Sequence, residues 1–171
     1  MFQQDDLIVY GSTGICRVDA IGQPEQAHLA DKDRLYYTLI PLYSSGMIYT
    51  PVDTTVFMRP IISAEEAHRL IDSIPNLDVQ AYHNSSTPLL RDHYLRAIQT
   101  HDCAELIKLT MSIFSKRKDI ALKGKKMGQV DEQFLKRAQD LLFCEFAAAL
   151  NIPREDVSEY ITARVAVLAQ E

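Results

Sequence analysis

Basic side chains gather in one stretch of this chain, and the chemistry they offer is phosphate binding. Residues 84–137 hold eleven Lys and Arg against six Asp and Glu, although the 171-residue chain has a net charge of −5. A phosphate contact needs only a positive charge with reach. The same side chains can instead serve only to solvate a helical surface. The candidate phosphate-binding residues are Arg91, Arg96, Lys116, Arg117, Lys118, Lys123, Lys125 and Lys126.

A second group, His101-Asp102-Cys103, carries the side-chain types of a nucleophilic cysteine site. Residues adjacent in the chain rarely face one another, and Cys103 falls at the start of a predicted helix, where a small apolar role is common. The sequence has no glycine-rich phosphate loop, paired-carboxylate motif or metal-ligand spacing. The prediction is therefore a protein that is not an enzyme and that uses no metal or other cofactor.

Two neighbouring segments with alternating apolar residues predict a β-hairpin. Residues 36–42 and 46–53 both follow this pattern, and Ser44-Ser45-Gly46 supplies the turn. Pro51 cannot donate a ladder hydrogen bond, so it ends the second strand or places that strand at a sheet edge. An edge strand can dock another protein by strand addition, unless the protein's own helix covers it.

The segments around this hairpin predict a small β module. Residues 7–10 and 15–21 have the composition of strands, residues 22–33 form a polar loop, and residues 56–58 close the sheet. Five short strands within the first 60 residues predict an SH3-like or Tudor-like barrel.

From residue 63 onward the apolar spacing is that of helices. Ser63 and Glu66 form a capping box, Pro75 stops this first helix, and residues 76–86 form a polar linker. Thr87-Pro88 opens a second helix, because proline is tolerated in the first helical turn.

Three further helices are predicted in the remainder. Asp102 caps one, residues 131–150 form the next after a loop at 123–128, and Pro153 begins the last. The predicted fold class is α+β, an all-β module followed by an all-α bundle of four to five helices. The expected parts are residues 1–60, a helix and linker at 61–86, and a helical domain at 87–171.

Composition indicates a globular protein, with 47% hydrophobic and 24% charged residues. No apolar run approaches the roughly 20 residues of a membrane span, and residues 1–6 lack the basic region of a signal peptide. Cys16, Cys103 and Cys144 are odd in number and far apart, which favours free thiols in a reducing compartment. We therefore expect a cytoplasmic protein with neither a membrane partner nor a small-molecule substrate.

Short motifs in both predicted parts carry a resemblance to a known family. The N-terminal motifs are Asp6-Leu7-Ile8-Val9-Tyr10, Gly14-Ile15, Tyr36-Tyr37-Thr38-Leu39, Thr50-Pro51-Val52 and Met58-Arg59. The C-terminal motifs are Phe134-Leu135-Lys136-Arg137-Ala138-Gln139, Leu142, Glu145 and Phe146-Ala147. In their order and spacing they resemble the CarD family of bacterial transcription regulators.

The resemblance implies two partners. The N-terminal domain of such proteins binds the RNA polymerase β subunit by strand addition, and the helical domain contacts promoter DNA upstream of the melted bubble. Open-complex stability changes as a result, and the DNA contacts carry no sequence preference. The strand that corresponds to the polymerase-binding strand is Met47, Ile48, Tyr49 and Thr50.

This chain departs from the family at a position that matters for DNA. Well-known members carry a tryptophan early in the first helix of the helical domain, where it wedges against the minor groove, but this chain has no tryptophan. Counting back from Tyr94, the wedge position falls on Leu90. Leucine can act as an apolar wedge, although Leu90 is also a plausible core residue of its own helix.

Two smaller departures concern the β module. Tyr10-Gly11 stands where the family usually has Tyr-Pro, and Phe57-Met58-Arg59 stands where Gly-Leu-Arg is common. The missing tryptophan and the net negative charge favour an alternative function, a protein-only adaptor that binds polymerase or another partner without touching DNA. The basic stretch at residues 91–126 argues against that alternative.

Overall fold

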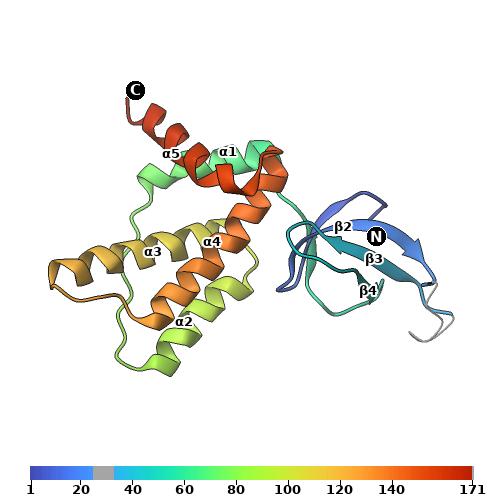
Figure 1. Ribbon diagram of the computed structural model, residues 1–171, viewed down its shortest axis with the longest axis horizontal. Helices are drawn as coiled ribbons and strands as arrows, with labels where there is room; N and C mark the ends of the chain where they lie inside the picture. The colour runs from blue at the N-terminus through green and yellow to red at the C-terminus, as the bar shows by residue number, and fades with distance from the viewer. Residues whose placement is uncertain (25–32, 171) are drawn as a thin grey trace. The chain divides into compact units, whose positions relative to one another are not determined.

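The computed structural model describes residues 1–24 and 33–170 and divides the chain into two units (Figure 1). The first, Met1–Ile62, is built from strands and is called the β module below. The second, Ser63–Glu171, is built from helices and is called the helical unit. The predicted α+β fold class, with strands first and helices after, is confirmed.

Within residues 1–24 and 33–62, the β module contains one antiparallel five-stranded sheet with the strand order β4-β3-β2-β1-β5. A register shift between Val18 and Ala20 bends the second strand against the third. The predicted closing strand begins at Met58, later than expected, and Val56 and Phe57 before it are exposed. Most of the predicted loop at residues 22–33 lies outside the described residues. The strands are β1 (Leu7–Tyr10), β2 (Gly14–Gly22), β3 (Tyr36–Pro41), β4 (Ile48–Pro51) and β5 (Met58–Pro60).

The core of the β module comes from the inward positions of three strands. Ile8, Cys16, Val18, Tyr37 and Leu39 form one buried cluster. They come from β1, β2 and β3, as the alternation of apolar residues in the sequence predicts. Burial raises the pKa of the Cys16 thiol to about 11, so this cysteine acts as a small apolar core residue.

In the described residues the helical unit has five α-helices, as the spacing of apolar residues predicts. Their inward faces supply the core, with Leu106, Ile113, Leu142 and Phe146 among its most buried residues. The helices are α1 (Ala64–Ser73), α2 (Thr87–Gln99), α3 (Cys103–Leu122), α4 (Gln129–Leu150) and α5 (Val157–Leu168), with short 3-10 turns at Ile74–Asn76 and Arg154–Asp156.

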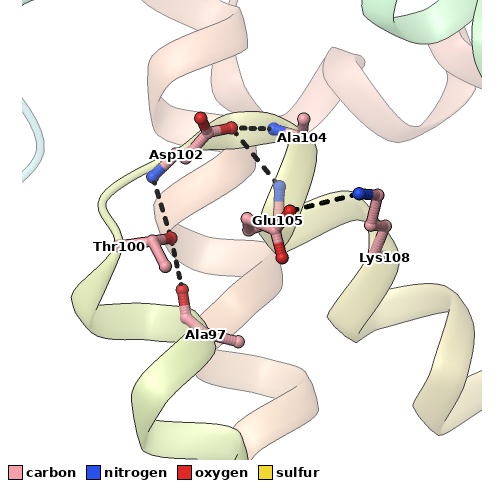
Figure 2. A network of polar contacts seen from close by, with 6 residues as sticks. All are labelled: Ala97, Thr100, Asp102, Ala104, Glu105 and Lys108. Carbon is pink, nitrogen blue, oxygen red and sulfur yellow. Dashed lines mark hydrogen bonds and ion pairs between the residues drawn. The ribbon is translucent and has the colours of Figure 1, made fainter.

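The turn from α2 into α3 shows how the sequence sets a helix start (Figure 2). The Asp102 carboxylate accepts hydrogen bonds from the backbone N–H groups of Ala104 (2.7 Å) and Glu105 (3.4 Å). The Thr100 hydroxyl donates to the carbonyl of Ala97 and accepts from the N–H of Asp102. These bonds satisfy amide groups that a helix terminus leaves without partners, as the predicted cap requires.

Helix α1 and the segment after it belong to the helical unit. Asp72 on α1 pairs with Arg164 on α5 through two hydrogen bonds, and the Arg164 guanidinium lowers the pKa of the Asp72 carboxyl. In the segment before α2, the Ser112 hydroxyl donates to the carbonyl of Gln80 at 2.9 Å. The division of the chain therefore lies between residues 62 and 63, and residues 76–86 are packed into the helical unit.

Candidate functional site

Strand β4 lies at one end of the sheet, and within the described residues its outer edge pairs with no other strand. Its inner edge pairs with β3, with Thr50 opposite Tyr37 and Ile48 opposite Leu39. Just beyond the strand, the N–H of Val52 donates to the carbonyl of Leu35 at 3.0 Å. The predicted hairpin is therefore present, and its second strand is an edge.

The bond between Val52 and Leu35 identifies the backbone groups that point outward. In an antiparallel pair, hydrogen-bonded and non-hydrogen-bonded positions alternate. Ile48 and Thr50 therefore direct their N–H groups at β3, whereas Tyr49 directs its N–H to the open edge. Pro51 also occupies an outward position but has no N–H. Within β4, Tyr49 is thus the residue that offers an outward donor.

Of the four candidate polymerase-binding residues, two have side chains that contact the module and two have side chains that are at least partly exposed. Thr50 is buried and accepts a hydrogen bond from the Tyr10 hydroxyl at 3.1 Å, and Ile48 packs against the core. Met47 is 51% exposed, and Tyr49 is partly exposed. Leu42 and Tyr43, in the same hairpin, are also exposed. The edge therefore combines free backbone groups with apolar side chains, which is what strand addition uses.

The start of α2, the end of α3 and the start of α4 lie toward the same side of the helical unit (Figure 1). His83, just before α2, contacts Asp119 near the end of α3, with 3.3 Å between Nε2 and Oδ2. Asp131, in the first turn of α4, accepts hydrogen bonds from both α2 and α3. The first turns of α2, the last turns of α3 and the loop before α4 hold six exposed candidate residues, called the basic pole below: Arg91, Arg117, Lys118, Lys123, Lys125 and Lys126.

Lys116 does not belong to this surface, so its prediction as a phosphate-binding residue is corrected. The residue is 6% exposed, and its Nζ lies 2.9 Å from Oδ1 of Asp131. The Tyr94 hydroxyl donates to the same carboxylate oxygen at 2.6 Å. Burial is the main cause of the raised pKa of Tyr94, which keeps this hydroxyl protonated as a donor. Lys116 therefore acts inside the fold.

Leu90 is also buried, which contradicts its assignment as a wedge against DNA. It is 7% exposed and lies on the same face of α2 as the buried Tyr94 and Ile98. Its neighbour Leu89 is 57% exposed. The positions i, i+4 and i+8 occupied by Leu90, Tyr94 and Ile98 place Leu90 inward, so this spacing could have identified Leu89 as the outward residue.

Arg96 is exposed but lies in the last turn of α2, away from the start of that helix. It pairs with Asp92 at 2.7 Å, within its own helix. Together with Lys108 it borders a groove between α2 and α3. Six of the eight basic candidates are therefore exposed on α2, on the last turns of α3 or in the loop before α4, whereas Arg96 lies in the last turn of α2 and Lys116 is buried.

The residues considered for nucleophilic chemistry have structural contacts. Asp102 caps α3, and the buried Cys103 thiol donates to Oε2 of the buried Glu145 at 3.0 Å. No group of three or more His, Cys, Asp or Glu residues placed to hold a metal occurs among residues 1–24 and 33–170. Over the same residues, no helix combines the length and apolar character needed to cross a membrane.

A small antiparallel β module with an open edge strand has the form of a protein-binding domain. Residues 2–62 match the family model of the CarD-like/TRCF RID domain, and this range coincides with the β module. The β module therefore belongs to this family of RNA polymerase-interacting domains, as the N-terminal motifs predicted. The helical unit lies outside the matched range. A search of curated proteins finds no match to the chain.

Proposed function

We propose that this protein is a CarD-like transcription regulator with no catalytic activity of its own. Its β module binds the RNA polymerase β subunit through β4, and its helical unit contacts promoter DNA upstream of the bubble and changes open-complex stability. The observation that carries the proposal is the family match over residues 2–62, since it covers the unit that has the open edge strand.

The β4 edge supports strand addition as the mode of binding. Tyr49 offers an outward N–H, and exposed apolar side chains at Leu42, Tyr43 and Met47 flank the strand. Main-chain hydrogen bonds supply affinity in this mode, while side chains on alternate positions supply specificity. The finer assignment to the β subunit follows from the family resemblance.

The basic pole supports contact with DNA. Its six candidate side chains are exposed, and four of them fall between Lys118 and Lys126. Such cations bind the phosphates of DNA whatever its base sequence, so we propose affinity for DNA without base preference. Leu89, which is exposed at the start of α2, replaces Leu90 as the residue able to act as an apolar wedge.

Replacement of Lys123, Lys125 and Lys126 by Ala is expected to weaken binding to polymerase–promoter complexes for every promoter sequence. The slope of log affinity against log salt should fall by about 0.9 for each phosphate that is no longer neutralised. Affinity measured across a salt series checks this result. The matched control replaces Lys108, Lys136 and Arg137, three exposed cations outside the basic pole, and makes the same change in net charge. Equal slopes in the two triple variants would contradict the proposed pole.

Leu89→Ala and Leu90→Ala are expected to behave differently. Leu90→Ala should cost about 2–5 kcal/mol of folding stability, because it opens a cavity in the core. Leu89→Ala should leave the thermal unfolding temperature nearly unchanged but shorten the open-complex lifetime, with no change in salt slope, because an apolar wedge neutralises no phosphate. Unfolding and open-complex lifetime are measured on both variants. A normal lifetime with Leu89→Ala would exclude the wedge.

The burial of Leu90 and Lys116 favours one alternative, a protein-only adaptor that binds polymerase without holding DNA. Both residues were candidates for DNA contact, and both act inside the fold. The adaptor function predicts that the three-lysine variant binds polymerase–promoter complexes with an unchanged salt slope. The salt series therefore decides between the two functions.

A further inference from the structure

The helical unit contains an apolar pocket that the proposed function does not use. It has a volume of about 290 Å³ and lies among α3, α4, α5 and the turn after α1. Its apolar lining includes Ile74, Ile107, Met111, Phe114, Phe143 and Ile161. Small-molecule sites in helical bundles form between helices and have volumes from about 300 Å³ upward. The size suits a small ligand but is too limited for a folded segment of another chain.

Two aromatic rings of the pocket each lie beside a guanidinium group. The Cζ atom of Arg117 is 5.4 Å from the ring centroid of Phe114, and that of Arg154 is 5.9 Å from the ring centroid of Phe143. Arg154 also pairs with Asp140. Arg117, in contrast, forms no ion pair with any carboxylate in the part of the chain that the structure describes. Arg117 is therefore the positively charged side chain next to the pocket that is available to bind an anion.

Two of the three hydroxyl groups that line the pocket are poor partners for an anion. The Thr110 hydroxyl donates to the carbonyl of Leu106, and the Thr162 hydroxyl donates to the carbonyl of Ser158, both at 2.9 Å. Their hydrogens are thus committed to the backbone, which leaves oxygen lone pairs toward a ligand. The pocket lining in the described residues includes no Asp, Glu, Lys or Arg. The remaining polar groups, the Ser158 hydroxyl and the Gln139 amide, are uncharged, so an anionic ligand would place its apolar body inside and its charge at the exposed Arg117.

From this geometry we infer a binding site for a small amphiphilic anion, with an alkyl or aromatic body in the pocket and a carboxylate on Arg117. Burial of the body supplies the affinity, because it removes apolar surface from water. The guanidinium supplies the preference for an anion, since it binds carboxylates through charge-assisted hydrogen bonds. Ligand binding itself is independent of the proposed transcriptional function.

One consequence does rest on that function. Arg117 belongs to the basic pole, so a bound carboxylate would occupy a cation that is also proposed to contact phosphate. The ligand should therefore lower the affinity for polymerase–promoter complexes but leave the affinity for polymerase alone unchanged. If the ligand binds but the affinity for polymerase–promoter complexes does not fall, the result would count against the DNA contact. The inference of a ligand-binding site would still stand.

The full chain is labelled with isotopes at its isoleucine methyl groups and observed by NMR. It is titrated with decanoate below the micelle concentration and, in a separate experiment, with the neutral alcohol decanol. Saturable shifts are expected at the methyl groups of Ile74, Ile107 and Ile161. Ile8 and Ile15 in the β module should not shift and serve as internal controls. Absence of saturable shifts with both probes would overturn the inference.

Arg117→Gln is expected to weaken decanoate binding about tenfold and to leave decanol binding unchanged, because only the acid carries a charge. The control Lys118→Gln removes the neighbouring exposed cation and should change neither. Ser158→Trp should block both probes, because Ser158 is exposed and lines the pocket, so a large ring can fill it from the surface. Thermal unfolding shows that each variant is folded. Equal binding of decanoate by wild type and Arg117→Gln would overturn the assignment of the anion to Arg117.

Discussion

A Tyr49→Pro variant is expected to lose most of its affinity for the polymerase β subunit, by at least about tenfold. Proline removes the outward N–H of β4, and its ring prevents close approach of a second strand. The hydrogen bonds to β3 should persist, because they come from the neighbouring residues Ile48 and Thr50. A pull-down with the isolated β subunit, followed by calorimetry, measures the loss.

Two control variants separate docking from folding. Tyr49→Ala keeps the N–H and loses only the side chain, so it should retain more affinity than Tyr49→Pro. Ile48→Pro removes an inward N–H and should destabilise the β module itself, which makes it an unsuitable docking test. If Tyr49→Pro is folded and binds as wild type does, the docking surface lies elsewhere on the module.

Lys116→Met is expected to lower the free energy of unfolding of the helical unit by about 3–5 kcal/mol. The Lys116 and Asp131 side chains are 7% and 5% exposed, so removal of the ammonium leaves a buried carboxylate that still accepts from the Tyr94 hydroxyl but has lost its opposite charge. Denaturant unfolding of the full chain measures this cost. The reason for the large effect is the uncompensated charge, since an intact buried pair often contributes little net stability.

The matched control is Lys118→Met, two residues further along α3, where the side chain is exposed. Surface substitutions of this kind usually change stability by less than about 0.5 kcal/mol. The double variant Lys116→Met, Asp131→Leu should recover much of the loss, because it removes both buried charges together. A small effect of Lys116→Met alone would mean that water reaches the Asp131 carboxylate.

The sequence predicts the local features of this fold well. The hairpin follows from alternating apolar residues, and the caps at Ser63 and Asp102 follow from side chains placed to accept amide hydrogen bonds. The inward face of α2 also follows from spacing. Of the two roles that the sequence left open for Leu90, the core role agrees with its burial, whereas the wedge role came from the family position alone. In each of these cases the determining residues lie within a few positions of one another.

Features that depend on distant residues could not be predicted in this way. Lys116 groups with the basic residues in the sequence, because its partner, Asp131, lies 15 positions further along the chain. The contact between Asp72 and Arg164 spans 92 positions, so the sequence gives no sign that α1 joins the later helices. The direction of the Tyr49 N–H depends on which residues of β3 and β4 stand opposite one another. Such pairings are a property of the folded chain.

Pro51 restricts how a partner strand can align with β4. Outward donors in a strand recur at every second residue, so the next outward position after Tyr49 falls on a residue that cannot donate. A partner strand shifted by two residues would leave one of its carbonyl groups opposite proline and lose a hydrogen bond with a net value of about 0.5–1.5 kcal/mol. The edge therefore favours a single alignment of the docked strand, and it is a poor template for the open-ended pairing of identical chains.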